Sequence, residues 1–196
     1  MITVRIINET PIEDVREAIA VTLGKEKFST SPKDILSYYK TLFLQNHSII
    51  RSIHIRIKDT NARQDVTRQL LRATKGHPQP YVQSGRPDWT GLPRDESASI
   101  LFLHDHTPES FIEEAKQRLC FRAMKETRLT VLEILKVMAT SGDPLLEALA
   151  WCCVPNCLVQ YGCPEGSFNC GWFDGKRYPT GLLDRRDKYY KEVVSG

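Results

Sequence analysis

Two adjacent patterns, an alternating segment and then a basic helical one, constrain the fold of this chain most. Residues 51–58 alternate isoleucine with polar side chains, which is the period-two pattern of a strand with one buried face. Residues 62–75 then repeat apolar side chains at spacings of four and three, as a helix with one buried face does. The helix is expected to stop at Gly76, because Pro78 and Pro80 follow it.

The remaining patterns predict more helices and two further strands around this unit. Residues 2–7 and 99–103 have the composition of strands, and capping residues followed by proline open several helices. Helices are expected at 11–24, 31–43, 107–141 and 144–151. We therefore expect an α/β fold of the α+β type, with a mixed or antiparallel sheet flanked by helices. This domain would cover residues 1–150, and a cysteine-rich appendage would cover residues 151–196.

Composition narrows the classes of function. The chain has 196 residues, of which 41% are hydrophobic and 26% charged, as in an ordinary globular protein. No apolar run approaches the roughly 20 residues that a membrane span needs, and the first residues lack the pattern of a signal peptide. We therefore expect a cytoplasmic protein without a membrane partner. The net charge of +3 is too small to indicate nucleic-acid binding.

The basic helix and the loop after it carry side chains that suit an oxyanion. Gln69 and Arg72 lie three residues apart on one helix face, and the loop supplies Ser84, Gly85 and Arg86. A hydroxyl, a glycine that lets backbone N–H groups approach, and a planar guanidinium suit a bound phosphate. The alternative is a solvated basic helix followed by an ordinary turn.

This stretch resembles the signature region of the flavin-dependent thymidylate synthases, the ThyX family. The family's helix carries R-Q-x-x-R and its loop carries S-x-R, which match R-Q-L-L-R at 68–72 and S-G-R at 84–86. A second family signature, R-x-x-x-x-A-Q-W-E, is similar to residues 118–126, where the first arginine, the alanine and the glutamate fit. The tail C-P-E-G-x-x-x-C-G of some members is similar to residues 163–171.

The resemblance implies a pyrimidine-nucleotide site and a reaction. The family methylates dUMP at C5 with a one-carbon folate and reduced FAD, and it assembles as homotetramers whose sites are shared between subunits. By this resemblance Arg118 and Arg72 would be catalytic, stabilising negative charge on the pyrimidine carbonyls, and Ser84 would join them by holding the phosphate. The implied nucleotide-binding residues are Gln69, Arg72, Ser84, Gly85, Arg86 and Arg118. His47 has the spacing of a histidine that the family uses at the flavin site.

The departures from the family concentrate on one ligand. Positions that hold the pyrimidine nucleotide in the family are kept, whereas positions that contact the flavin are mostly changed. The changed positions are Ser52, Ile53, Ala73, Thr74, Thr107 and Glu109. Two functions follow: a diverged flavin-dependent enzyme that modifies C5 of a pyrimidine nucleotide, or a nucleotide-binding homologue without flavin that has a regulatory or assembly role. Nucleic-acid binding is a weaker third function, since no aromatics alternate with the basic residues of the helix.

Five cysteines lie within residues 152–170. In a reducing compartment such thiols indicate metal binding or free cysteines rather than disulfides. Cys153, Cys157, Cys163 and Cys170 could close a tetrahedral site for zinc or another thiolate-bound metal, although no C-x-x-C pair is present. The alternative is a set of free, partly buried thiols.

Two histidines close the strand expected at 99–103. His104 and His106 would share one strand face, which would allow both to bind one metal ion. The sequence shows no clear third ligand beside them, and two such histidines more often mark a polar strand end.

Overall fold

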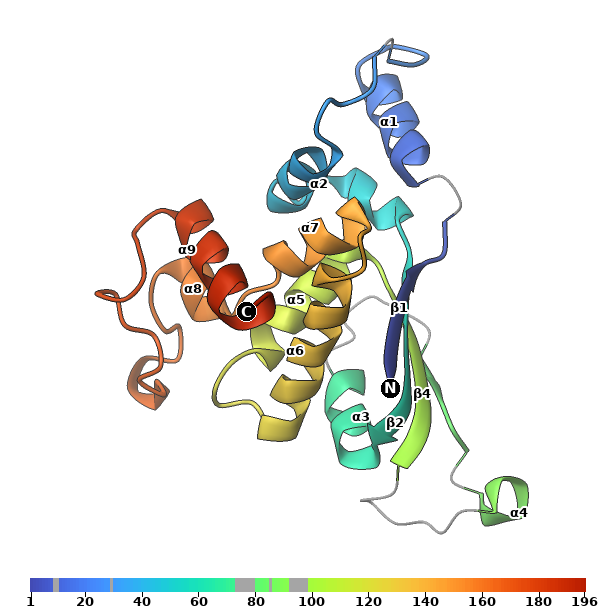
Figure 1. The fold of residues 1–196 in the computed structure, drawn as a ribbon, viewed down its shortest axis with the longest axis vertical. Coiled ribbons are helices and arrows are strands. Elements are labelled where there is room, and N and C mark those ends of the chain that lie inside the picture. The colour runs from blue at the N-terminus through green and yellow to red at the C-terminus, as the bar shows by residue number, and fades with distance from the viewer. Residues whose placement is uncertain (9–10, 29, 73–79, 85, 92–98) are drawn as a thin grey trace.

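A computed structural model describes residues 1–8, 11–28, 30–72, 80–84, 86–91 and 99–196 of the chain. Four strands pair in the order β1-β2-β4-β3, and most of the helices lie on one side of them (Figure 1). The strands are β1 (Ile2–Ile6), β2 (Ile55–Arg63), β3 (Pro80–Val82) and β4 (Ser99–His106). All three described pairings are antiparallel. This confirms the predicted α/β fold with a sheet flanked by helices, and of the two predicted alternatives, mixed or antiparallel, the described sheet is antiparallel.

Capping side chains set the starts of several helices. The Asp34 carboxylate accepts from the backbone N of Ser37 at 3.0 Å and opens α2, and Asp143 accepts from Leu145 N at 2.8 Å and opens α7. The helices are α1 (Pro11–Thr22), α2 (Ile35–Leu44), α3 (Gln64–Leu71), α4 (Pro87–Thr90), α5 (Pro108–Arg118), α6 (Lys125–Ala139), α7 (Pro144–Cys152), α8 (Asn156–Gln160) and α9 (Leu182–Tyr189). Within the described ranges, no helix is both long and apolar enough to cross a membrane.

The strand before the basic helix lies further along the chain than predicted. A short 3₁₀ turn, η1 (Ser48–Ser52), occupies the start of the expected strand, and β2 continues to Arg63. The pairing register shifts between Asp59 and Ala62, where the Asp59 carboxylate accepts from the backbone N of Asn61 at 2.9 Å. Pairing with β4 resumes after this bulge and continues to Arg63, and α3 therefore starts two residues later than expected.

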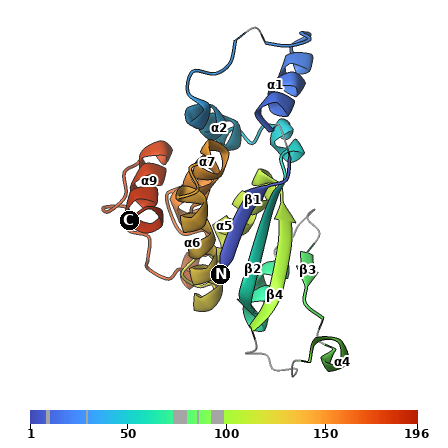
Figure 2. The ribbon, with the colours of Figure 1, turned by 45° about the vertical axis from the view of Figure 1, so that its right-hand side comes forward.

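The two faces of the sheet differ sharply in burial. Ile57 pairs with Val4 on one side and His104 on the other, and it is fully buried. On the opposite face the register partners Arg56 and Asp105 form an ion pair with an Nε–Oδ1 distance of 2.6 Å. Figure 2 shows α5, α6 and α7 on one side of the sheet. The apolar core therefore fills the space between these helices and one sheet face.

The single helix predicted over 107–141 is wrong, because the chain turns between α5 and α6. Met124 is not helical, with φ −51° and ψ 129°, and Ala123 N donates to Cys120 O at 2.9 Å across the turn. The Phe121 ring stacks on Trp172 with centroids 4.9 Å apart. A continuous helix could not keep this contact with the C-terminal segment, so tertiary packing overrides the helical pattern.

The C-terminal segment packs on the rest of the chain. Tyr178, Tyr189 and Val194 are buried and belong to the same cluster of core residues as α6 and α7. The buried Arg186 guanidinium donates to the carbonyl of Cys152 at the end of α7. The predicted division after residue 150 falls inside α7, and the separation into two domains stays a prediction.

Two neighbouring substitutions on β2 test the assignment of the sheet faces. Ile57→Ala removes a fully buried side chain and should lower the free energy of unfolding by about 2–5 kcal/mol, since a cavity replaces it. Lys58→Ala, on the exposed face, should change that free energy by less than about 0.5 kcal/mol. Urea denaturation measures both, and equal losses for the two variants would contradict the assignment.

Candidate functional site

The two segments that resemble the ThyX signatures meet between α3 and α5. The Arg118 guanidinium, at the end of α5, donates through Nη2 to the backbone carbonyl of Gln69 on α3. Both residues are half-buried, and Arg72, which follows α3, is exposed. Arg118 Nε is buried and has no hydrogen-bond partner among the described residues. Two of the predicted nucleotide-binding residues, Gln69 and Arg118, thus meet at this helix contact, and Arg72 ends the same helix as Gln69.

The predicted phosphate-binding turn lies elsewhere in the chain. The Ser84 hydroxyl accepts from the backbone N of Arg86 at 3.2 Å, and the Arg86 guanidinium pairs with Asp88 at 2.6 Å and stands 4.3 Å from the centre of the Trp89 ring. Arg86 begins the turn into α4, which stands apart from α5 in both ribbon views (Figures 1 and 2). Gly85 lies outside the described residues. One chain therefore does not bring this turn to Arg118.

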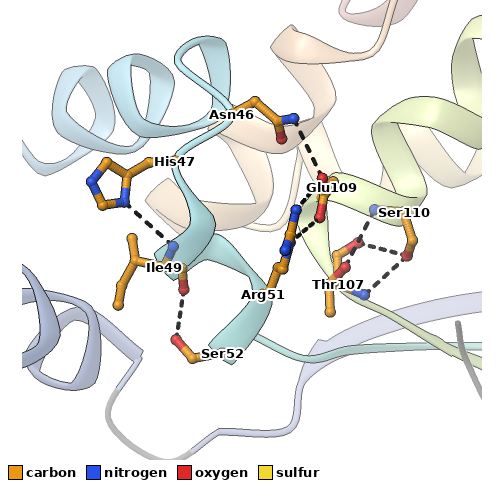
Figure 3. A network of polar contacts seen from close by, with 8 residues as sticks. All are labelled: Asn46, His47, Ile49, Arg51, Ser52, Thr107, Glu109 and Ser110. Carbon is orange, nitrogen blue, oxygen red and sulfur yellow. Dashed lines mark hydrogen bonds and ion pairs between the residues drawn. The ribbon is translucent and has the colours of Figure 1, made fainter. Parts of the chain in front are cut away.

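Internal contacts occupy the described positions that the resemblance would place at a flavin (Figure 3). The Glu109 carboxylate accepts from Arg51 Nε at 2.6 Å and from Arg51 Nη2 at 3.1 Å, and Asn46 donates to it at 3.4 Å. Thr107 is fully buried and caps α5, since its hydroxyl accepts from Ser110 N at 3.3 Å. The bonds between Arg51 and Glu109 hold η1 against the start of α5.

The other residues expected near the flavin are also used internally. His47 Nδ1 accepts from the backbone N of Ile49 at 3.3 Å and caps η1. The Ser52 hydroxyl donates to the carbonyl of Ile49 at 2.7 Å, and Ile53 is buried in the core. Ala73 and Thr74 lie outside the described residues.

A buried polar cluster joins β4 to the middle of α5. His104 Nδ1 lies 2.6 Å from His106 Nε2, and His106 Nε2 lies 3.5 Å from Glu114 Oε2. The three residues are between 1% and 3% exposed. Burial lowers the pKa of His104 to about 3 and raises the pKa of Glu114 to about 8, while nearby Arg118 acts in the opposite direction on Glu114. Loss of hydration thus favours the neutral forms of His104 and Glu114.

Glu114 is the member of this cluster that sequence reasoning missed. Ser110, Glu114 and Arg118 are spaced by four residues, so they lie on one face of α5. His106 Nδ1 lies 3.2 Å from the Ser110 hydroxyl. This spacing, read together with the histidines just before the helix, was the available signal.

Four thiols line a cavity of about 480 Å³ between the turn after α5 and the C-terminal segment. They belong to Cys120, Cys157, Cys163 and Cys170. Cys153, which the sequence suggested as a ligand, is completely buried and does not line this cavity. Burial, with a smaller contribution from the other three cavity thiols, raises the pKa of the Cys157 thiol to about 11. Among the described residues, no three of these sulfurs converge to within 4.8 Å.

Thiol reactivity should follow this arrangement. Cys170 is exposed and should react first with iodoacetamide. Cys152 and Cys153 should react last, because burial raises the pKa of Cys152 to about 12 and that of Cys153 well above its ordinary value. Pulsed labelling followed by peptide mass spectrometry measures the order, with urea-unfolded protein as the control. Equal rates at Cys153 and Cys170 in the folded protein would contradict the placement.

No family model, no curated protein and no solved structure matches the chain. The function proposed below therefore depends on the placement of the chain's own residues and on the resemblance of residues 68–72 and 118–126 to the ThyX signatures.

Proposed function

We propose that the chain binds dUMP or a related pyrimidine nucleotide, as a diverged relative of the flavin-dependent thymidylate synthases. The contact between Arg118 and Gln69 carries the proposal. It joins two segments, 49 residues apart in the sequence, that resemble the two signatures of the family. A ligand site built from both segments requires that they lie together, as this contact places them.

The chemistry at this contact suits a pyrimidine ring. Arg118 keeps a buried Nε–H that has no hydrogen-bond partner among the described residues, and the exposed guanidinium of Arg72 follows at the end of α3. Guanidinium donors can bind the pyrimidine carbonyls and stabilise negative charge that develops on them. The Gln69 side chain has both donor and acceptor atoms, as an imide edge requires.

A second copy of the chain would complete the site. Ser84 and Arg86 suit the nucleotide phosphate, but they precede α4, which stands apart from α5 (Figures 1 and 2). In the family that the chain resembles, each site is shared between subunits. We therefore infer a homo-oligomer, a tetramer by analogy, in which this turn of one copy faces α3 and α5 of another.

The contacts of Glu109 favour a nucleotide-binding protein that works without flavin. A carboxylate stands where the family has an arginine, and it already binds Arg51 in two places. Because Arg51 neutralises it, the pair has no net positive charge to attract a flavin diphosphate, and the buried Thr107 is committed to capping α5. The described residues thus do not fit FAD. Methylation of C5 with a folate one-carbon donor and reduced flavin stays the activity that the resemblance predicts.

Nucleotide binding should depend on Arg72. Arg72→Ala should weaken dUMP binding roughly ten- to hundredfold, the value of one or two charge-assisted hydrogen bonds. Arg63→Ala removes a nearby guanidinium that pairs with Asp65 and should leave the affinity unchanged. Isothermal titration calorimetry measures the affinities, and stabilisation of the melting temperature by dUMP supports them. Absence of any dUMP effect on the native chain would refute the proposal.

Flavin binding separates the two functions. We expect purified protein mixed with FAD, with or without dUMP, to show no visible flavin absorbance after removal of free cofactor. The Glu109→Ala variant should bind dUMP as the native chain does, because Glu109 contacts η1 rather than α3. Retained flavin absorbance would instead favour the enzyme.

A further inference from the structure

We propose that His104, His106 and Glu114 form a binding site for one divalent transition-metal ion. The ligating atoms of the three side chains lie within 4.8 Å of one another, and all three residues are buried. Two come from one face of β4 and the third from α5, so the site joins a strand to the helix that covers it. The inference stands on this cluster and does not depend on the proposed nucleotide site.

Hydrogen bonds determine which ring nitrogen of His106 carries the proton and which carries the lone pair. The Ser110 hydroxyl donates to the carbonyl of Thr107 at 3.0 Å and accepts from the backbone N of Thr107 at 3.1 Å. Its remaining capacity is as an acceptor, so His106 Nδ1 donates to it. The lone pair of His106 therefore resides on Nε2, which faces His104 and Glu114. A hydrogen bond to the distal nitrogen is the usual support of a metal-binding histidine.

Glu114 supplies the second argument for a cation. Both of its carboxylate oxygens are buried, and neither has a hydrogen-bond partner among the described residues. Native proteins rarely leave such atoms unsatisfied, because each costs desolvation energy. The carboxylate and the His106 Nε2 lone pair are both electron-rich and lie 3.5 Å apart. Without a metal ion, His104 Nδ1 can donate to His106 Nε2 at 2.6 Å, but this leaves Glu114 without a hydrogen-bond partner among the described residues. A metal ion would use the carboxylate and both histidine nitrogens at once.

The donor set selects the class of metal. Two imidazole nitrogens and one carboxylate are the ligands of many zinc sites and of non-haem iron(II) sites, whereas magnesium and calcium prefer oxygen. The His104 and His106 nitrogens are 2.6 Å apart, and tetrahedral zinc with bonds of about 2.05 Å would hold them roughly 3.3 Å apart. The two rings would therefore separate slightly when the ion enters.

The ion would also fix the orientation of α5. Glu114 lies one turn before Arg118, whose guanidinium reaches α3. An ion bound to both β4 and Glu114 would hold this helix at one angle on the sheet. Because the cluster is almost inaccessible to solvent, we assign the ion a positioning role rather than direct contact with a substrate.

The test uses the full chain with Cys163→Ser and Cys170→Ser, which removes two cavity thiols that would compete for metal. After treatment with a chelator, zinc is titrated by calorimetry and the melting temperature is recorded. One equivalent of zinc should bind and raise the melting temperature. Cobalt(II) in the same protein should give visible d–d bands without the near-ultraviolet charge-transfer bands of thiolate ligands.

Two variants of adjacent residues make the result specific. Glu114→Gln should abolish the zinc effect, and the metal-free variant should be at least as stable as its parent, since it removes a buried carboxylate. Glu113→Gln, at an exposed position that pairs with Lys116, should keep the full effect. His104→Gln should behave as Glu114→Gln does. No zinc binding in the parent, or an undiminished effect in Glu114→Gln, would overturn the site and leave a protonated Glu114.

Discussion

The connection between β4 and α5 sets the geometry on which the rest of the structure depends. Only Thr107 separates the strand from the helix, and its hydroxyl and backbone exchange hydrogen bonds with Ser110 in a capping box. Such a short connection folds α5 back over the sheet face that carries His104 and His106. Residues at every fourth position of α5 then face the strand end and, further along, α3. A polar stripe on one helix is thereby placed inside the core.

Apolar side chains surround this stripe, so burying its polar groups costs free energy. His104 and His106 pair across the sheet with Ile57 and Ile55, both fully buried, and the His104 ring stacks on Phe102 with centroids 4.4 Å apart. In a region of low dielectric constant, an unsatisfied carboxylate costs more and an ion pair gains more than in water. The stability of this part of the core therefore depends on whether a proton or a metal ion compensates His104, His106 and Glu114.

The sequence predicts the features that local chemistry controls and misses those that distant contacts control. Alternation on β2 and a proline after a cap were sufficient to predict a strand and the starts of α1, α5 and α7. The start predicted at residue 31 is wrong, because α2 begins at Ile35 behind the cap that Asp34 forms. The apolar stripe of residues 107–141 continues through the break before α6, and the stacking of Phe121 on Trp172 could not be read from it. The same contact between distant segments explains why Cys120, rather than Cys153, lines the cavity with the tail thiols.

The charged side chains along α5 differ in how far contacts within the chain satisfy them. At its start, the Glu109 carboxylate is neutralised by Arg51 of η1, so a position that contacts a cofactor in the resembled family serves the fold of this chain. In the middle of α5, the Glu114 carboxylate has no hydrogen-bond partner among the described residues. At its end, the buried Nε–H of Arg118 also has none among them. An internal ion pair needs no ligand, whereas unsatisfied buried groups gain from one. The start of α5 is thus stabilised within the chain, whereas its middle and end are the parts that a ligand would stabilise.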